Sequence, residues 1–318
     1  MVDGGASTRM ALIPDKRGFF FTILTIITLS LFLITYGIYN EFKERSSEQK
    51  RVKTLDSFLK ATEADLSRQA YIMGFRAIFI IESAISASGS YSSDVNAQVN
   101  EIIQNGTLGG VPQPLMIGAT LPEISAFANE KASKLNAELT LSQPTIHVFQ
   151  RDPWQVIVQI NTTLVLNDKN DKANWTISES IEAPLEIDNF EDPIYIVNTN
   201  GLVTNKITRT PYENFTQGTD VTNLIDHVTN SYYTATSLAP SFMQRLEGNL
   251  TPSEEGIESL VNLQELSSAG ITVQDKSVVD HVYFSSQNPL AYRIQGMQSW
   301  FKIDDAHLQI YGVEELIL

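Results

Sequence analysis

The chain contains no cysteine among its 318 residues. This absence excludes disulfide bonds, metal sites built from thiolates and catalysis by a cysteine nucleophile. It leaves the cellular compartment open, because disulfide-free proteins are also exported. Thiol chemistry is therefore excluded, and the location of the protein has to be inferred from other features.

Positive charge is scarce, with 22 Lys and Arg residues against 37 Asp and Glu residues and a formal net charge of −15. A protein that neutralises phosphates needs an excess of cations, so nucleic acid is not expected as a partner. The hydrophobic fraction of 42% is that of an ordinary folded chain with a sizeable core. An acidic, solvated surface explains the charge balance.

Histidine is rare as well, with four residues in the whole chain. No two of them stand at the spacing that places metal ligands on one helix face. Two follow aspartates, as Asp226-His227 and Asp280-His281, but isolated histidines are more often structural or exposed. Because phosphate-binding glycine motifs are also absent, the sequence predicts no catalytic residue, no metal site and no cofactor. It favours a protein that is not an enzyme.

What the sequence does contain is an uncharged stretch at residues 19–39, with no proline and only Gly37 as a glycine. A helix of about 21 residues covers about 30 Å, the thickness of the hydrocarbon core of a bilayer. No small-residue cleavage site follows Tyr39, so the segment differs from an ordinary secretory signal. It predicts a single transmembrane helix in the cell membrane, with the lipid bilayer as its partner.

Residues 40–88 contain no proline and only Gly74 as a glycine, which favours a continuous helix. Apolar residues follow one another there every three or four positions, the pattern of one helix face. A helix over residues 19–88 would be about 105 Å long. We expect residues 40–88 to form a helical stalk that packs into a head. The positions of the stripe are Val52, Leu55, Leu59, Thr62, Leu66, Ala70, Met73, Ala77, Ile80 and Ala84.

The second half of this stalk, residues 70–88, is apolar nearly all round except for Arg76 and Glu82. A second membrane crossing is therefore an alternative. Each of the two charges would cost on the order of 3 kcal/mol in lipid. Burial in a protein core explains the same pattern without that cost and is preferred.

A basic pair and a glycine, Lys16-Arg17-Gly18, precede the phenylalanines that open the apolar stretch. This junction resembles the class III signal of type IV pilins and related archaeal surface proteins. The resemblance implies that residues 1–18 are a cytoplasmic leader, cut between Gly18 and Phe19, and that pilin-like subunits or envelope proteins are partners. One departure is Ile23, where bacterial major pilins carry a glutamate needed for filament assembly.

Two later passages resemble uncharacterised single-pass archaeal envelope proteins. They are Phe190-Glu191-Asp192-Pro193, followed by Asn200-Gly201, and residues 240–250.

Two features of the sequence make opposite predictions about which side of the membrane the head lies on. Basic residues are more numerous after the apolar stretch than before it, which favours a cytoplasmic head. Those after it alternate with glutamates at helical pair spacing, which lowers their weight. Five Asn-x-Thr acceptor sequences favour an extracellular, glycosylated head. They begin at Asn105, Asn161, Asn174, Asn214 and Asn249.

Residues 89–318 are expected to form one α+β head with an antiparallel sheet and several short helices. A short helix is predicted at residues 93–104, ended by Asn105-Gly106, and another opens at the capping box of Thr120 and Glu123. Period-two alternation predicts a meander of three strands at residues 145–150, 154–166 and 173–187. Asn161 and Asn174 fall on the polar faces of these strands.

The remaining signals are shorter. A hairpin is predicted around Asn200-Gly201, between strands at residues 194–197 and 202–208. A calcium site is the alternative weighed for the acidic cluster just before it, which is interpreted as a polar turn: Glu186, Asp188, Glu191 and Asp192. Helices are then expected at residues 219–233, 240–247 and 253–266, and strands at 278–284 and 300–303.

These features favour a pilin-like, membrane-anchored structural or adhesion protein whose large domain lies outside the cell. The alternative is a membrane-anchored enzyme or solute-binding protein whose site is assembled from residues far apart in the sequence. A cytoplasmic scaffold is the third interpretation, favoured only by the flanking charges.

Overall fold

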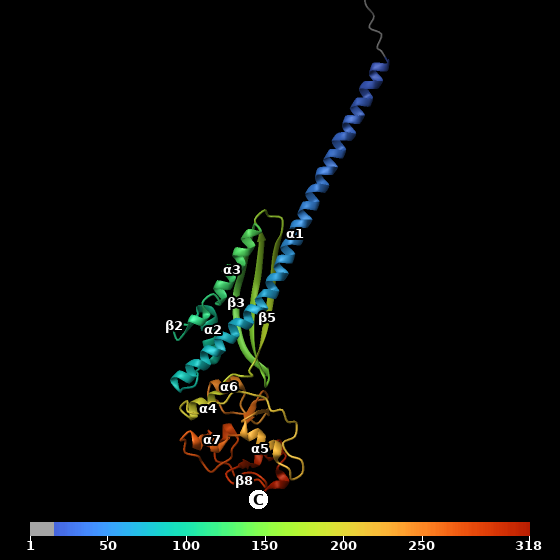
Figure 1. Cartoon of the computed structure of the whole chain (residues 1–318). Helices are drawn as coiled ribbons and strands as arrows, with labels where there is room; N and C mark the ends of the chain where they lie inside the picture. The colour runs from blue at the N-terminus through green and yellow to red at the C-terminus, as the bar shows by residue number, and fades with distance from the viewer. Residues whose placement is uncertain (1–15) are drawn as a thin grey trace, which may run out of the picture. The chain divides into compact units, whose positions relative to one another are not determined.

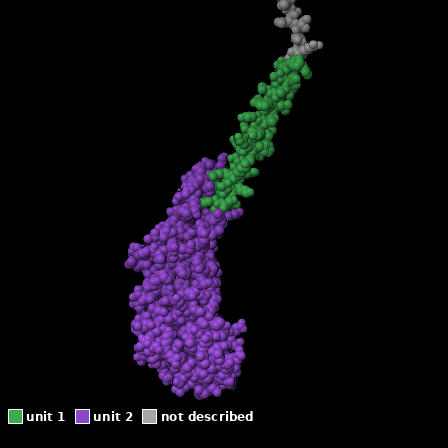
Figure 2. Space-filling model, viewed as in Figure 1, with its two compact units in different colours: residues 1–58 green, residues 59–318 purple. Residues whose placement is uncertain are grey.

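The computed structural model describes the backbone of residues 16–318 and the side chains of residues 19–318. The chain divides into two compact units, residues 1–58 and residues 59–318 (Figure 2). One helix, α1 (Lys16–Ser88), contributes to both. The structure is mixed α+β with a long N-terminal apolar helix and antiparallel sheets, which confirms these parts of the predicted fold class. Residues 1–15 of the predicted leader lie outside the described part of the chain.

In the first unit, the predicted apolar stretch forms part of α1 and its side chains are exposed throughout. The helix is long and apolar enough to cross a membrane, and none of its most apolar 18-residue window is buried. The three threonine side chains Thr25, Thr28 and Thr35 each donate a hydrogen bond to the carbonyl four residues earlier. These hydroxyl groups are therefore satisfied within the helix, as an apolar solvent would require.

In the second unit, the predicted stripe of α1 is buried from Leu59 to Ile80. At Gly74 the helix approaches the sheet so closely that a Cβ atom would lie 2.6 Å from Val158 Cγ2. The two charges of residues 70–88 also have partners, because Arg76 donates to the Leu115 carbonyl and Glu82 accepts from the Glu191 amide. Packing in the head thus explains the buried face of this segment, whereas Tyr71, Phe75 and Phe79 remain 42–45% exposed.

The main sheet is the predicted meander, with strands β3 (Ala137–Asp152), β4 (Gln155–Asp168) and β5 (Asn174–Glu186) in the order β3-β4-β5. The even-numbered apolar residues of β4 are buried, which confirms the predicted face. Strand β3 begins earlier than predicted. Its pairing with β4 is interrupted between Ser142 and Thr145, where Gln143 has φ 50° and Pro144 has no amide hydrogen to donate. Because of this interruption, the period-two pattern did not reveal the first half of the strand.

Two helices and a small hairpin complete this part of the head (Figure 1). Helix α2 (Val95–Asn105) ends at Gly106, which has φ 67°, as predicted. The hairpin β1 (Thr107–Leu108) and β2 (Val111–Pro112) and the turn η1 (Pro114–Met116) follow. Helix α3 (Leu121–Lys134) opens with the predicted capping box of Thr120 and Glu123 and packs on β3.

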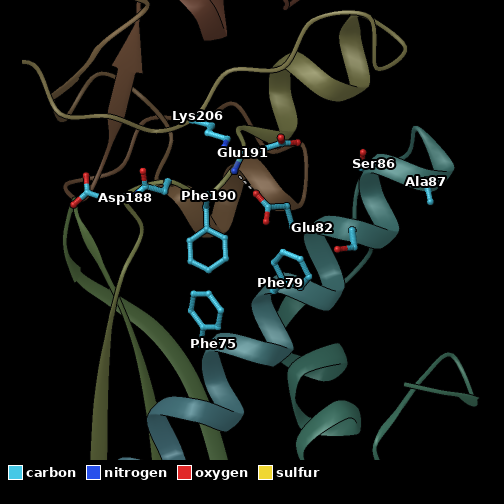
Figure 3. Close-up of a pocket in the computed structure, with 11 residues that line it drawn as sticks. Phe75, Phe79, Glu82, Ser86, Ala87, Asp188, Phe190, Glu191 and Lys206 are labelled. Atoms are coloured by element: carbon cyan, nitrogen blue, oxygen red, sulfur yellow. Dashed lines mark hydrogen bonds between the residues drawn. The ribbon is translucent and has the colours of Figure 1, made fainter. Parts of the chain in front are cut away.

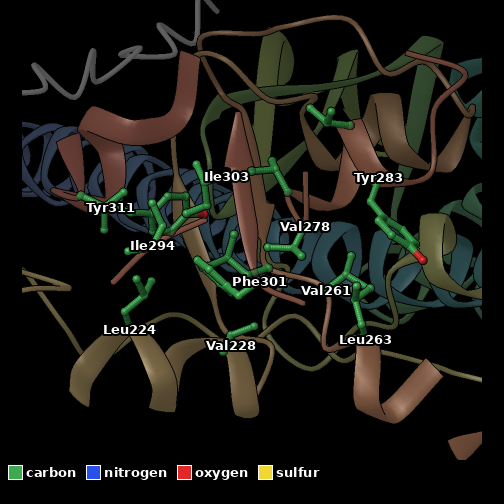
Figure 4. Packing of buried hydrophobic residues seen from close by; sticks show 14 of the residues in the cluster. Leu224, Val228, Val261, Leu263, Val278, Tyr283, Ile294, Phe301, Ile303 and Tyr311 are labelled. Atoms are coloured by element: carbon green, nitrogen blue, oxygen red, sulfur yellow. The ribbon is translucent and has the colours of Figure 1, made fainter. Parts of the chain in front are cut away.

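The chain after β5 forms a lobe of short elements gathered at one end of the sheet (Figure 1). Their common interior is a cluster of buried apolar side chains, in which Phe301, Ile303 and Tyr311 lie among helices and short strands (Figure 4). The strands pair as β6 with β7 and β8 with β9, both antiparallel. The elements are α4 (Pro193–Asn198), α5 (Thr222–Thr229), β6 (Tyr233–Ala235), α6 (Phe242–Leu246), β7 (Ile257–Ser259), α7 (Leu263–Ser268), α8 (Asp280–Tyr283), β8 (Ala291–Arg293), β9 (Lys302–Asp304), η2 (Asp305–His307), α9 (Leu308–Tyr311) and η3 (Glu314–Leu316).

Three predictions for this lobe are wrong. Residues 194–197 belong to helix α4, because Asp192 caps the helix and Pro193 occupies its first position. The expected helix at residues 253–266 is strand β7 followed by α7, and the expected strand at 278–284 contains helix α8. The segment at 278–284 is a short, largely apolar run, in which periodicity cannot separate a buried strand from a buried helix.

Helix α5 and the predicted helix at 240–247 are present but shorter than expected, and the predicted late strand at 300–303 is confirmed in part by β9.

The close approach at Gly74 gives the first prediction. Gly74→Leu should lower the free energy of unfolding of the head by roughly 2–3 kcal/mol, because its side chain would overlap Val158 and Leu185. Gly37→Leu is the matched control, since nothing lies within 4 Å of a Cβ atom there. Thermal unfolding of both variants in the same detergent measures the difference. Equal transitions would contradict the packing described here.

Candidate functional site

The centre of the lobe holds a fully buried arginine, Arg245, on helix α6. The helix is positioned by a capping box in which Ser241 and Gln244 exchange side-chain-to-backbone hydrogen bonds. The Arg245 guanidinium places Nη1 2.5 Å from Asp192 Oδ2 and 3.0 Å from Asp280 Oδ2. We call Arg245, Asp192 and Asp280 the buried charge cluster.

Each carboxylate of this cluster also binds the backbone or side chain of another element. Asp192 caps α4 by accepting a hydrogen bond from the backbone amide of Ile194. It also accepts a hydrogen bond from the hydroxyl of Tyr233 on β6. Asp280, at the start of α8, accepts from the amide and hydroxyl of Ser259 on β7. Arg245 itself donates to the Ile257 carbonyl. The cluster therefore joins α4, α6, α8, β6 and β7.

The electrostatics of the cluster follow from complete burial of all three groups. Burial would raise the pKa of Asp280, but the charge of Arg245 outweighs burial and holds that pKa below its ordinary value. Burial raises the pKa of Asp192, and the nearby Asp280 carboxylate raises it further, although Arg245 opposes both. The two carboxylates together outweigh the effect of burial on the Arg245 guanidinium and raise its pKa. Asp280 is therefore ionised at neutral pH and pairs with Arg245.

Two histidines lie beside this cluster. His281 follows Asp280 on α8, and its Nδ1 lies 3.3 Å from Asp280 Oδ1. His307, at the end of η2, has its Nδ1 2.6 Å from Asp304 Oδ1, and the two imidazole ring centroids are 5.4 Å apart. The Asp280-His281 pair noted in the sequence is therefore part of a buried polar site.

Glu258 on β7 completes the group. One of its oxygens accepts a hydrogen bond from the Tyr311 hydroxyl at 2.9 Å, and Oε2 lies 3.3 Å from His307 Nε2. Burial would lower the pKa of His307, but its contacts with Asp304 and Glu258 outweigh burial and raise that pKa to about 10. Glu258, His281 and His307 each place one ligand atom within 4.8 Å of the others, so these residues could hold a metal ion.

The remaining two histidines are not among the groups of this site, although His227 packs on Tyr311 with the ring centroids 5.8 Å apart. His227 is buried against Phe215, with Nδ1 3.2 Å from Thr210 Oγ1, and burial lowers its pKa to about 3 despite the charge of Asp226. It is a neutral packing residue. His147 is exposed on β3.

A separate pocket of about 510 Å³ opens between the last turns of the α1 helix and residues 188–206. Phe75, Phe79 and Phe190 face one another in it, and the carboxylate of Glu82 points to the Glu191 amide (Figure 3). We call it the phenylalanine pocket. Burial raises the pKa of Glu82 to about 8, in spite of the hydrogen bond from Glu191.

The residues singled out from the sequence lie elsewhere. Phe19 is 71% exposed, and the backbone of Gly18 lies in the first turn of α1. Asn161, on β4, is half-buried and its side chain donates to Gln159. The structure does not bring these residues together with the buried polar site. The other acceptor asparagines are exposed: Asn105, Asn174, Asn214 and Asn249.

The acidic cluster predicted from Glu186 to Asp192 is polar surface only in part. Glu186 and Asp188 pair with the half-exposed Arg209, whereas Asp192 is fully buried against Arg245. That part of the prediction is wrong, because the sequence does not show which distant cation an aspartate meets. The Asp192-Pro193 helix start was the local signal that could have separated Asp192 from its neighbours.

In comparisons with known proteins, no protein-family model, no curated protein and no solved structure matches the chain.

The buried charge cluster gives the second prediction. Arg245→Met should lower the free energy of unfolding by about 3–5 kcal/mol, because it leaves two carboxylates buried without their cation. Arg209→Met is the control, since Arg209 also contacts two carboxylates but is 42% exposed. Its loss should cost below about 1 kcal/mol. Urea unfolding measures both, and a loss at Arg245 no larger than at Arg209 would contradict the assignment.

The third prediction concerns Glu82, which is surrounded by the charged groups of Glu191, Asp192 and Lys206. Because folding raises its pKa from 4.5 to about 8, the folded state binds the proton more tightly than the unfolded state. Its contribution to stability is complete below pH 4.5 and is lost as the pH rises to about 8. At about 1.4 kcal/mol per pKa unit, the loss amounts to a few kcal/mol.

Glu82→Gln should therefore flatten the pH dependence of stability over this range and be more stable than the unaltered protein at its upper end. Glu130→Gln is the control, because the hydrogen bond and charge of Lys134 already hold the pKa of Glu130 below 4.5. Urea unfolding at a series of pH values tests this. The same pH slope with and without Glu82 would show that its carboxylate is not destabilised by burial.

Proposed function

We propose that the chain is a membrane-anchored protein that presents its α+β head on the outside of the cell as a structural or adhesion subunit. The observation that carries this proposal is the apolar part of α1, whose side chains between residues 19 and 39 are exposed. Exposure of so large an unbroken apolar surface to water is unfavourable, whereas contact of the same surface with the hydrocarbon core of a bilayer is favourable.

Two alternative roles for the apolar helix have less support. A helix in the core of a soluble protein would be mostly buried, and the apolar window of α1 is not. A signal removed behind its apolar segment would require a cut within α1, which continues to Ser88 without a break. Retention of the helix as an anchor agrees with both observations.

The pilin-like part of the proposal rests on the junction Lys16-Arg17-Gly18 before Phe19. A cut between Gly18 and Phe19 would leave the apolar helix as the new N-terminus of the anchored protein. The extracellular side is supported by four acceptor asparagines whose side chains are exposed on the head. We propose assembly with envelope proteins through the anchor and contacts of the head.

A second candidate function is the binding of a small ligand in the phenylalanine pocket. It is favoured by the three aromatic rings that face one another beside Glu82 (Figure 3). Pockets for small molecules are commonly apolar with a few polar groups that orient the ligand. The carboxyl of Glu82 would be that group.

The fourth prediction tests the anchor and its direction. N-terminal sequencing of the protein from native membranes should find Phe19 as the first residue, and Gly18→Leu should leave the leader attached. Gly37→Leu, within the apolar stretch, is the control and should be processed normally. Recovery of the intact Met1 terminus from the unaltered protein would contradict the pilin-like processing.

Protease added to intact cells should digest the head and leave a fragment of the anchor. Asn174→Gln should remove one glycan if the acceptor, exposed on the polar end of β5, is used. A head that resists external protease on intact cells but not on opened cells would place it in the cytoplasm and contradict the proposed direction.

A further inference from the structure

Three residues of the lobe that are far apart in the sequence offer metal-binding atoms at one point. Glu258 comes from β7, His281 from α8 and His307 from the end of η2. All three are buried, and one ligand atom from each lies within 4.8 Å of the others. Such convergence in the interior requires a physical reason, because burying groups of this kind without partners is unfavourable.

The surroundings orient both imidazole rings in the same way. In each ring Nδ1 faces an aspartate, at 3.3 Å for His281 with Asp280 and at 2.6 Å for His307 with Asp304. Asp304 is held in turn by the hydroxyl of Ser277 at 2.6 Å. A carboxylate on one ring nitrogen fixes the tautomer of a histidine that binds metal through the other. Nε2 is then the ligand atom of each histidine.

Two of the atoms at this point have no hydrogen-bond partner. Glu258 Oε2 and His307 Nε2 are both buried, and although they are 3.3 Å apart no hydrogen bond of ordinary geometry joins them. The other oxygen of Glu258 is already bound by the Tyr311 hydroxyl. A cation between the two atoms would satisfy both, whereas leaving them unpaired costs free energy.

We propose that Glu258, His281 and His307 form a binding site for a divalent transition-metal cation of the zinc type. Two imidazoles and one carboxylate suit zinc and its neighbours, whereas magnesium and calcium prefer oxygen ligands alone. Three protein ligands leave one coordination position for a water molecule. The cation would cross-link β7, α8 and the turn after β9, since each of these elements supplies one ligand.

The competing arrangement uses the same atoms without a metal. A proton on His307 would make an imidazolium between Asp304 and Glu258, which also neutralises part of the local negative charge. The geometry of Glu258 and His307 favours the cation, because an imidazolium should donate a well-formed hydrogen bond to Glu258 Oε2. The two arrangements differ in whether the purified protein binds zinc at one equivalent.

The fifth prediction is tested on the full chain without an affinity tag, purified in detergent and treated with a chelator. Zinc alone is then added, and binding is measured by calorimetry and by elemental analysis after dialysis. We expect one zinc per chain and a zinc-dependent rise of the unfolding temperature. His281→Gln and His307→Gln should each weaken zinc binding at least 10-fold and abolish the rise of the unfolding temperature.

His147→Gln is the control, because His147 is exposed on β3 and lies outside the lobe, and this variant should bind zinc as the unaltered protein does. Cobalt substitution gives a readout that does not depend on variants, because tetrahedral nitrogen and oxygen coordination has an intense visible absorption. That spectrum decides the matter if a ligand variant fails to fold. Absence of one-equivalent binding by the unaltered protein, or unchanged binding in both ligand variants, would overturn the proposal.

Discussion

The lobe after β5 depends on the burial of one guanidinium group between two carboxylates. Its helices and strands have between three and eight residues, lengths at which isolated elements are not stable in water. Arg245, Asp192 and Asp280 compensate for this, because each carboxylate binds a second element while it pairs with the same cation. Removal of Arg245 would leave both carboxylates buried without their cation, which is strongly unfavourable.

Both parts of the head bury an apolar core, but the remainder of the head is built from longer elements. Helix α1 and the strands β3 to β5 are long, and their regular apolar faces pack against each other with Gly74 at the closest approach. Burial of apolar surface provides the main stabilisation there.

The sequence allowed prediction where a pattern repeats over many residues. The continuous helix through residue 88, the buried stripe from Leu59 to Ile80 and the three-stranded meander all follow from periodicity. The capping box at Thr120 and the end of α2 at Gly106 follow from local chemistry. The first half of β3 escaped prediction because Gln143 and Pro144 interrupt its pairing.

The candidate site escaped prediction because its ligands come from distant segments. Glu258, His281 and His307 lie on three different elements, so no local motif links them. The sequence did contain one signal of a buried polar site. Glu258 and Asp280 are charged residues that each stand within a short apolar run, and both runs are buried in the lobe. A charged residue in such a run must find a partner, but the sequence does not show that the partner is Arg245 or Tyr311.

The most direct measurement of the role of the buried charge cluster is the coupling free energy between Arg245 and Asp280. It comes from a double-mutant cycle with Arg245→Met and Asp280→Asn in urea unfolding. If the buried pair organises the lobe, the double variant should be less destabilised than the sum of the single variants by more than about 2 kcal/mol. Additivity within about 0.5 kcal/mol would show that the two groups act independently and would contradict that role.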